Sequence, residues 1–199
     1  MNKDILLCGV GGQGTVLASK LIASAAMRAG ETVHSAETIG MAQRGGSVTS
    51  HVRIGDKSYS PLIPVGSADM ILAFEPAEAV RNLRCLKKDG IVIVNSVSVK
   101  PVTESLRDTG YDGSEMIEYL KKNCTRVIVV NAEEICAEVG SSKVFNVAIL
   151  GVAVGTGKIG LSREDVLAEI GRQVKEKFVE MNYKAFSEGE RIGAGHEIK

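Results

Sequence analysis

The sequence predicts an α/β fold with a doubly wound, mainly parallel sheet. Apolar runs typical of buried strands alternate with helical patterns along a chain whose 199 residues fit one domain. The first apolar run leads into the stretch Gly9-Val10-Gly11-Gly12-Gln13-Gly14, in which Gly9, Gly11 and Gly14 satisfy the G-x-G-x-x-G fingerprint. A helical pattern follows this glycine loop at once, and the combination is typical of a Rossmann-like fold.

The glycine loop belongs to a predicted strand–helix–strand unit. We expect a strand over 5–8, a helix over 13–29 and a second strand over 32–36. A right-handed crossover makes the two strands parallel and places the loop at their carboxyl edge. Glycines permit a tight turn and close backbone approach there, and the free N–H groups of the helix start favour an anion such as phosphate.

An inserted β-hairpin is expected next. Residues 47–54 alternate between apolar and polar faces, and a turn at 55–57 precedes a short antiparallel strand at 58–60. His51 and Arg53 share the polar face of the first of these strands. They are weak candidates for catalysis, because a partly exposed strand histidine is more often structural.

The remaining elements continue the alternation of strands and helices. Buried-type strands are expected at 69–74, 91–95 and 126–130. Helices are expected at 76–86, 114–122, 132–139, 143–155 and from 162 to 189. Asn131 and Ser162 fit the N-caps of two of these helices. We therefore expect one domain over 1–190, which ends in C-terminal helices, and a loose tail over 191–199.

A second glycine-rich loop precedes the expected hairpin. Its polar residues Gln43, Arg44 and Ser47 flank Gly45 and Gly46, whose backbone an anion can approach. A guanidinium is a planar donor suited to phosphate or carboxylate. We interpret this loop as a second anion-binding segment, and the alternative is a flexible connection with a solvated arginine.

Three further polar residues are candidates for ligand contacts, each with a structural alternative. Glu37 follows a strand where dinucleotide-binding folds keep a ribose-binding acid, but it also fits a solvated loop. Glu75 either faces a ligand at the carboxyl end of its strand or complements the N-terminus of the next helix. Asn146, inside an apolar helix, is either a ligand contact or a satisfied core amide. Gly151 and Gly155 of that helix allow close helix packing within the fold or between subunits.

Composition excludes several classes of function. The 24 basic and 24 acidic residues balance, and aromatic residues are few, so nucleic-acid binding is not expected. No C-x-x-C spacing is present, so neither a metal site nor an iron–sulfur cluster is expected, and Cys8 reads as a small buried hydrophobe. No signal-peptide pattern opens the chain and the apolar run 144–154 is too short for a membrane span, so we expect a cytoplasmic protein without membrane association.

Several motifs, taken in order, resemble those of the gamma-type subunits of 2-oxoacid:ferredoxin oxidoreductases. These are the glycine loop, the Ala42–Val48 loop that runs into Ser50–Ile54, the Ile71–Pro76 strand end, and Asn146 with Leu150-Gly151. The Ile39–Gly46 form is most similar to the small (beta) subunits of indolepyruvate ferredoxin oxidoreductases. The resemblance covers most of the chain.

The resemblance implies oxidative decarboxylation of a 2-oxo acid, with thiamine diphosphate, iron–sulfur clusters, ferredoxin and coenzyme A. This chain carries no Gly-Asp-Gly thiamine motif and no cysteine spacing for clusters, so a large partner subunit is expected to hold both cofactors. The chain is then an inactive subunit when isolated, without a cofactor of its own. Within a hetero-oligomer it completes the active-site wall and a coenzyme A site, and self-association of the isolated chain remains open.

The residues that we expect at the cofactor site come from both glycine-rich loops and two helix starts. They are Gly9, Gly11, Gly12, Gln13, Gly14, Gln43, Arg44, Gly45, Gly46, Ser47, Glu75 and Asn146. The phosphate that they contact belongs either to coenzyme A or to thiamine diphosphate.

Three other functions remain open on the residues alone. The fingerprint also fits an autonomous NAD(P)-binding oxidoreductase, although no catalytic Lys, Tyr or His is evident for it. An ATP-dependent adenylating protein of the ubiquitin-activating type has a similar loop, but it usually adds a cysteine nucleophile or a zinc-binding quartet. A purely structural subunit, whose glycine loop holds no ligand, is the third alternative.

Overall fold

The computed structural model describes residues 1–40, 45–56, 59–100 and 110–196. In chain order the strands are β1 (Lys3–Val10), β2 (Val33–Ile39), β3 (Ser47–Ile54), β4 (Ala68–Ala73), β5 (Leu86–Asn95) and β6 (Arg126–Val130). The α-helices are α1 (Thr15–Arg28), α2 (Pro76–Asn82), α3 (Ser114–Asn123), α4 (Ala132–Val139), α5 (Phe145–Gly155), α6 (Arg163–Gln173) and α7 (Glu176–Gly195). Short 3-10 turns at 83–85 and 142–144 precede β5 and α5.

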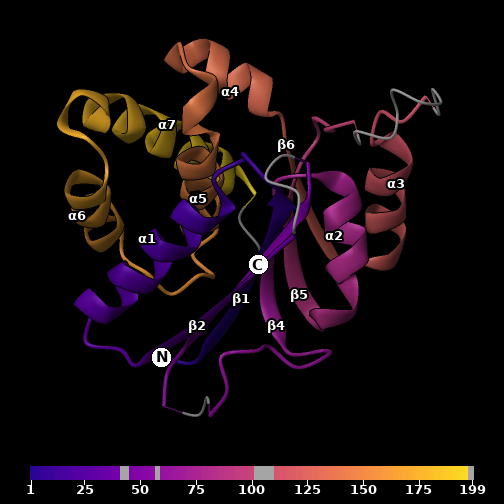
Figure 1. Ribbon diagram of the computed structural model, residues 1–199, viewed down its shortest axis with the longest axis horizontal. Coiled ribbons are helices and arrows are strands. Elements are labelled where there is room, and N and C mark those ends of the chain that lie inside the picture. Colours follow the sequence, from indigo (N-terminus) through magenta and orange to yellow (C-terminus); the bar gives the residue numbers. More distant parts are fainter. Residues whose placement is uncertain (41–44, 57–58, 101–109, 197–199) are drawn as a thin grey trace.

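The strands form one six-stranded sheet in the order β2-β3-β1-β4-β5-β6. Strands β1, β4, β5 and β6 are parallel neighbours, whereas β3 runs antiparallel to both β1 and β2. Helices α1, α5, α6 and α7 cover one face of the sheet, and α2 and α3 cover the other (Figure 1). The predicted α/β fold with a mainly parallel sheet is confirmed.

Two apolar cores follow from these layers. Alternate residues of the central strands point to opposite faces, so Leu7 and Leu72 join the core under α1 and α5, whereas Leu6 and Ile71 join the core under α2 and α3. All four side chains are fully buried. Burial on both faces explains why these strands read as continuous apolar runs.

The second strand of the chain is placed differently from the prediction. Strand β2 does run in the same direction as β1, but β3 lies between them and pairs with both. The hairpin therefore consists of β2 and β3, joined by the second glycine-rich loop. Residues 59 and 60 lie outside any strand, so the predicted return strand after β3 is wrong in its described part.

Two element boundaries are also corrected. Strand β5 begins at Leu86, five residues before the start of the strand predicted at 91–95. Helix α7 continues to Gly195, so residues 191–195 are helical and do not belong to a loose tail. The locally encoded helix starts are confirmed, because Asn131 accepts a hydrogen bond from the Glu133 N–H and Ser162 accepts one from the Asp165 N–H.

Helices α5 and α7 pack backbone to backbone. A Cβ at Gly151 would collide with the Phe186 carbonyl oxygen, and one at Gly189 would collide with the Ala148 carbonyl oxygen. Nearly every residue of α5 is buried, so this helix is the centre of its layer. Of the two predicted alternatives for the glycine pair in α5, the close contact lies within the fold.

Candidate functional site

The glycine loop lies at the topological switch point of the sheet. Strands β1 and β4 are parallel neighbours, yet α1 leaves β1 toward one face and α2 leaves β4 toward the other. The loops that leave the carboxyl ends of such strands diverge and open a crevice, which is where open α/β sheets bind ligands. Residues 9–14 leave the end of β1 and Glu75 follows the end of β4 at this point, although Glu75 itself is only 2% exposed.

The glycines of the loop have different physical roles. Gly12 and Gly14 have φ values of +100° and +81°, a region that L side chains rarely adopt. A Cβ at Gly12 would meet no described residue within 4 Å, whereas one at Gly14 would lie 2.7 Å from Asn146 Nδ2. A Cβ at Gly9 would lie 2.8 Å from that of Phe74. Gly12 therefore leaves open space, and the other two allow close packing.

Gln13 is a brace across the crevice. Its Oε1 accepts a hydrogen bond from the Val10 N–H at 2.8 Å, and its Nε2 donates to the Phe74 carbonyl oxygen at 2.9 Å. The side-chain amide thus joins the ends of β1 and β4 at both of its polar atoms. A direct cofactor contact from this side chain stays a prediction, and the structure shows a bracing role.

The start of α1 offers uncompensated donors. Gly14 is its N-cap, and no side chain in the described part of the chain makes a capping hydrogen bond there. Thr15 is 2% exposed, and its Oγ1 has no hydrogen-bond partner within the described residues. An uncapped helix N-terminus carries free N–H groups and a partial positive charge, which attract an anion.

A cleft of about 460 Å³, called the loop cleft below, opens beside the glycine loop. Its lining combines the loop, the end of β5 and the first turns of α4 and α5: Gly12, Gln13, Gly14, Asn95, Val97, Val99, Ala132, Glu133, Cys136, Ser142, Lys143, Phe145 and Asn146. The cleft therefore lies at the carboxyl edge of the sheet. Its volume is within the range of small-ligand sites.

Asn95 organises the floor of the loop cleft. Its Nδ2 donates to the carbonyl oxygens of Phe74 and Val97, and its Oδ1 accepts from the Ala132 N–H at 3.2 Å. These bonds tie the ends of β4, β5 and β6 together. Sequence reasoning missed Asn95 as a site residue, although a polar residue that ends a buried strand was an available signal.

Asn146 lies in the first turn of α5 and is 5% exposed. Its Oδ1 accepts a hydrogen bond from the Val147 N–H at 3.0 Å, and its Nδ2 faces Gly14 closely. The side chain is thus both a packed core amide and part of the lining of the loop cleft. A ligand contact from Asn146 stays a prediction.

The second glycine-rich loop lies next to the first. The Gly11 N–H donates to the Gly46 carbonyl oxygen at 2.8 Å. Between the first loop and β3, residues such as Gly11, Thr15 and Val48 line a hollow of about 310 Å³. The predicted site residues Gln43 and Arg44 lie outside the described residues, so their side chains stay predictions.

Ser47 and Glu75 belong to a hydrogen-bonded network around α2, in which Glu75 and Glu78 are buried and Ser47 is exposed. Ser47 Oγ donates to Glu78 Oε2 at 2.7 Å, and Glu78 also pairs with Arg81. Glu75 caps α2 by accepting the Glu78 N–H at 3.1 Å, and it accepts the Tyr111 hydroxyl at 2.6 Å. Burial and this hydrogen bond to Glu75 raise the pKa of Tyr111. The helix-capping alternative therefore accounts for Glu75.

Cys8 of β1 is a fully buried thiol that is influenced by the charges of this network. Burial, with smaller contributions from Glu78, Glu75 and Cys85, raises its pKa well above the ordinary value. The thiol stays protonated and packs as a small hydrophobe, as predicted.

Within the described residues, no group of three or more His, Cys, Asp and Glu side chains is arranged to hold a metal ion.

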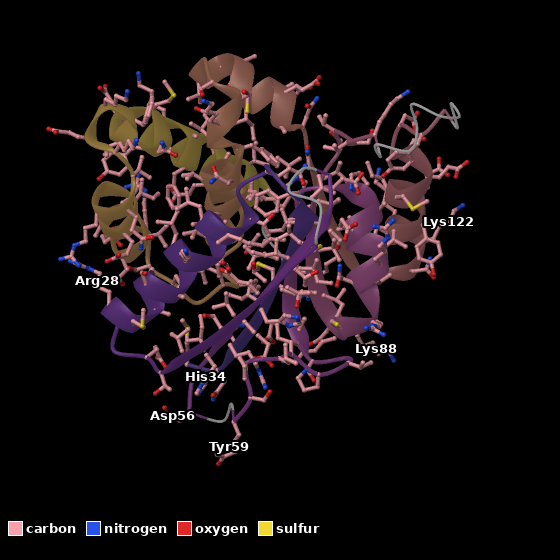
Figure 2. All side chains as sticks on the ribbon, viewed as in Figure 1. Arg28, His34, Asp56, Tyr59, Lys88 and Lys122 are labelled. Atoms are coloured by element: carbon pink, nitrogen blue, oxygen red, sulfur yellow. The ribbon has the colours of Figure 1, made fainter. Side chains whose placement is uncertain are left out.

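His51 and Arg53, the weak catalytic candidates, lie away from the loop cleft. Arg53 pairs with Asp4 at the start of β1, with Nε and Nη2 2.8 and 3.1 Å from its carboxylate oxygens. Arg53 Nη1 donates to the Ser60 carbonyl oxygen, and His51 Nδ1 accepts from the Ile63 N–H at 3.2 Å. Both residues hold a surface segment at the end of the molecule where Tyr59 projects (Figure 2). Their side chains therefore hold together the part of the sheet where β1 begins and β3 ends, away from the glycine loop.

Glu37 also has a partner within the fold. Its Oε1 accepts a hydrogen bond from Ser19 Oγ of α1 at 3.2 Å, while the residue stays exposed on the edge strand β2.

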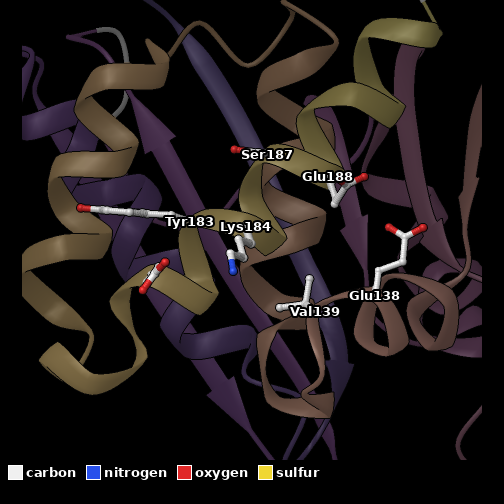
Figure 3. A pocket seen from close by; sticks show the side chains of 7 residues that line it. Glu138, Val139, Tyr183, Lys184, Ser187 and Glu188 are labelled. Atoms are coloured by element: carbon white, nitrogen blue, oxygen red, sulfur yellow. The ribbon is translucent and has the colours of Figure 1, made fainter.

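A further groove of about 340 Å³ lies between α4 and α7, where Glu138, Glu188 and Lys184 form part of its rim (Figure 3). None of the glycine-loop residues lines this helix groove.

No single helix in the described ranges is both long and apolar enough to cross a membrane. The segments 132–139 and 142–155 meet that criterion only as a pair, which is bent by 120°.

The chain is similar to known proteins over almost its whole length. Residues 4–192 match the family described as "Pyruvate ferredoxin/flavodoxin oxidoreductase". "Indolepyruvate oxidoreductase subunit IorB" of Archaeoglobus fulgidus is 45% identical over 190 residues, which cover 95% of this chain and 94% of that protein. "Pyruvate/ketoisovalerate oxidoreductases common subunit gamma" of Thermococcus kodakarensis is 33% identical over 188 residues, which cover 93% and 94%.

Solved structures agree in fold. The gamma subunit of a keto/oxoacid ferredoxin oxidoreductase from Geobacter sulfurreducens has a TM-score of 0.71 at 24% identity, covering 97% of this chain and 99% of that one. The 2-oxoglutarate:ferredoxin oxidoreductase of Magnetococcus marinus, with 2-oxoglutarate, coenzyme A and succinyl-CoA bound, has a TM-score of 0.72 at 18% identity. The match covers 98% of this chain and 31% of that chain. At these identities the likeness concerns the fold alone.

Proposed function

The chain belongs to the pyruvate ferredoxin/flavodoxin oxidoreductase family and is a subunit of a 2-oxoacid:ferredoxin oxidoreductase, and from this premise we propose that its glycine loop binds a phosphate of coenzyme A. In this proposal the loop cleft completes an active site whose thiamine diphosphate and iron–sulfur clusters lie on a larger partner subunit. The substrate is an arylpyruvate, because the relative at 45% identity is named an indolepyruvate oxidoreductase subunit.

The proposal depends on the uncapped start of α1, which follows two glycines with a left-handed backbone conformation. Gly12 and Gly14 expose backbone without side chains, and among the described residues no side chain caps the start of α1. The Gly11 N–H donates to the Gly46 carbonyl oxygen, so the second glycine-rich loop enters β3 next to the first. A phosphate there would receive backbone donors and the positive end of a helix dipole.

The loop cleft also offers groups for the rest of a coenzyme. Lys143 supplies a cation, while Val97, Val99 and Phe145 supply apolar surface. Asn95 keeps the floor of the cleft rigid through hydrogen bonds to three neighbouring segments. Coenzyme A combines phosphates with a long, weakly polar arm, so it needs such a mixed lining.

A matched pair of variants tests the anion site. Gly12→Asp places a carboxylate at the loop, whereas Gly12→Asn has the same shape without the charge, and both residues tolerate positive φ better than other side chains. We expect Gly12→Asp to weaken coenzyme A binding about tenfold relative to Gly12→Asn, because the carboxylate repels the phosphate. Titration calorimetry of the full chain, alone and with its co-expressed partner, measures this difference.

The same titration separates the rival functions. Tighter binding of NAD(P) or ATP than of coenzyme A would favour a dinucleotide- or nucleotide-binding protein that acts alone. Equal affinities for coenzyme A in the two Gly12 variants would reject the anion site. If none of these ligands bound to the chain or its complex, the loop would have a packing role only.

A further inference from the structure

A separate apolar cavity of about 170 Å³ lies next to the loop cleft. Its walls come from α1, the 142–144 turn, the connection between α6 and α7, and α7. The apolar lining residues are Leu17, Val144, Val174, Phe178 and Met181. This apolar cavity is distinct from the anion site, because none of the glycine-loop residues lines it.

The size of the apolar cavity fits an aromatic ring. A cavity of about 150 Å³ lined by Leu, Ile and Phe stays dry and binds benzene, so a slightly larger one has room for a ring with a substituent. Val144 is 2% exposed and forms the floor, while Phe178 is 40% exposed and lies at the rim. Met181 contributes a flexible thioether, which packs favourably against aromatic rings.

Polar groups at the edge of the apolar cavity would fix the orientation of a bound ligand. Lys143 lines both this cavity and the loop cleft, and its side chain makes none of the ion pairs found among the described residues. Asn182 is 6% exposed, and its Nδ2 donates to the Phe178 carbonyl oxygen at 2.8 Å. The Asn182 amide also carries an oxygen that can accept a ring N–H. A cation at one end and an apolar chamber at the other match a ligand with a carboxylate and an aromatic ring.

We propose that the apolar cavity binds the aromatic ring of a small carboxylate, with the carboxylate at Lys143. The inference rests on the proposed function, because it identifies this cavity as the subsite for the side chain of an aromatic 2-oxo acid. It also explains why Lys143 borders both spaces, since a ring in the apolar cavity directs the acid toward the loop cleft.

Binding of indole-3-propionate to the full chain tests the proposal. This probe has the ring and the carboxylate but lacks the 2-oxo group, so it is not decarboxylated. We expect saturation-transfer NMR to detect binding and the methyl resonance of ¹³C-labelled Met181 to shift on titration. Met181→Trp fills the apolar cavity and should weaken binding about tenfold or more, whereas Met27→Trp, at a side chain that is 57% exposed on α1, should leave it unchanged.

A second variant tests the orientation. Lys143→Gln should weaken the carboxylate probe several-fold but leave the neutral analogue 3-methylindole unaffected, because only the former carries a charge. Absence of binding to the wild-type chain, or equal binding by Met181→Trp and wild type, would overturn the proposal. The urea unfolding midpoint of Met181→Trp, compared with that of the wild type, serves as the fold control. Because the Gly12 variants test the anion site independently, failure of the ring subsite is distinguishable from failure of the proposed function.

Discussion

Two groups of glycines in this molecule use the missing side chain in opposite ways. In the glycine loop, Gly12 has a left-handed backbone with open space around it. At the contact of α5 and α7, Gly151 and Gly189 have ordinary helical backbones with no space at all. The loop needs glycine for conformation and access, whereas the helices need it for packing. Substitutions should therefore affect function in one region and stability in the other.

The largest effect is expected at the helix contact. Gly189→Ala forces a Cβ into the Ala148 carbonyl oxygen, which belongs to rigid helical backbone. We expect a loss of about 3 kcal/mol or more in unfolding free energy, measured by urea denaturation. Gly195→Ala is the matched control in the same helix, because nothing lies within 4 Å of a Cβ there. Equal stabilities of the two variants would contradict the packing role.

A smaller loss of stability is expected at the Arg53–Asp4 ion pair, where β1 begins and β3 ends. Arg53→Met removes the ion pair with Asp4, in which both side chains are 14% exposed. We expect a destabilisation of about 2 kcal/mol by denaturation, because a mostly buried carboxylate loses its partner. The exposed Arg84→Met is the control. A large loss of coenzyme A affinity in Arg53→Met would show that this edge takes part in the site.

Gly12→Ala should reduce the unfolding free energy less than the substitutions above, and it tests the functional role of the glycine loop. The substitution is strained only by its positive φ, so we expect about 1 kcal/mol of destabilisation. Gly30→Ala is a matched control, because Gly30 has a φ of +82° and equally open space. The two variants should unfold at similar urea concentrations, but only Gly12→Ala should bind coenzyme A more weakly. Equal affinities would separate the loop from the ligand.

The smallest effect concerns acid stability. Burial and the neighbouring Arg53 lower the pKa of His51, so the unfolded chain binds a proton more readily than the folded chain does. The stability that His51 contributes is thus fully present above its ordinary pKa and declines as the pH falls below it. Protonation at Nδ1 would also end the hydrogen bond from the Ile63 N–H. His51→Gln should flatten this part of a stability–pH profile, and an unchanged slope would refute the assignment.

Predictions from the sequence succeeded where neighbours in the chain decide the structure. The caps at Asn131 and Ser162 were found because each side chain bonds a backbone N–H two or three residues later. The strand 126–130 was found because its apolar run is continuous. In contrast, the hydrogen bond from Gln13 to the Phe74 carbonyl oxygen joins residues 61 positions apart, and no local pattern predicts it.

The sequence by itself determined the glycine fingerprint, the alternation of strands and helices and the family, because these depend on short-range patterns of backbone freedom and apolarity. Only the tertiary structure decided that β3 lies between β1 and β2, that Arg53 meets Asp4, and that Asn95 and Asn146 border one cleft. Strand order and pairing of distant side chains depend on how whole layers pack. Several arrangements satisfy the same local patterns, so a linear sequence of motifs does not select among them.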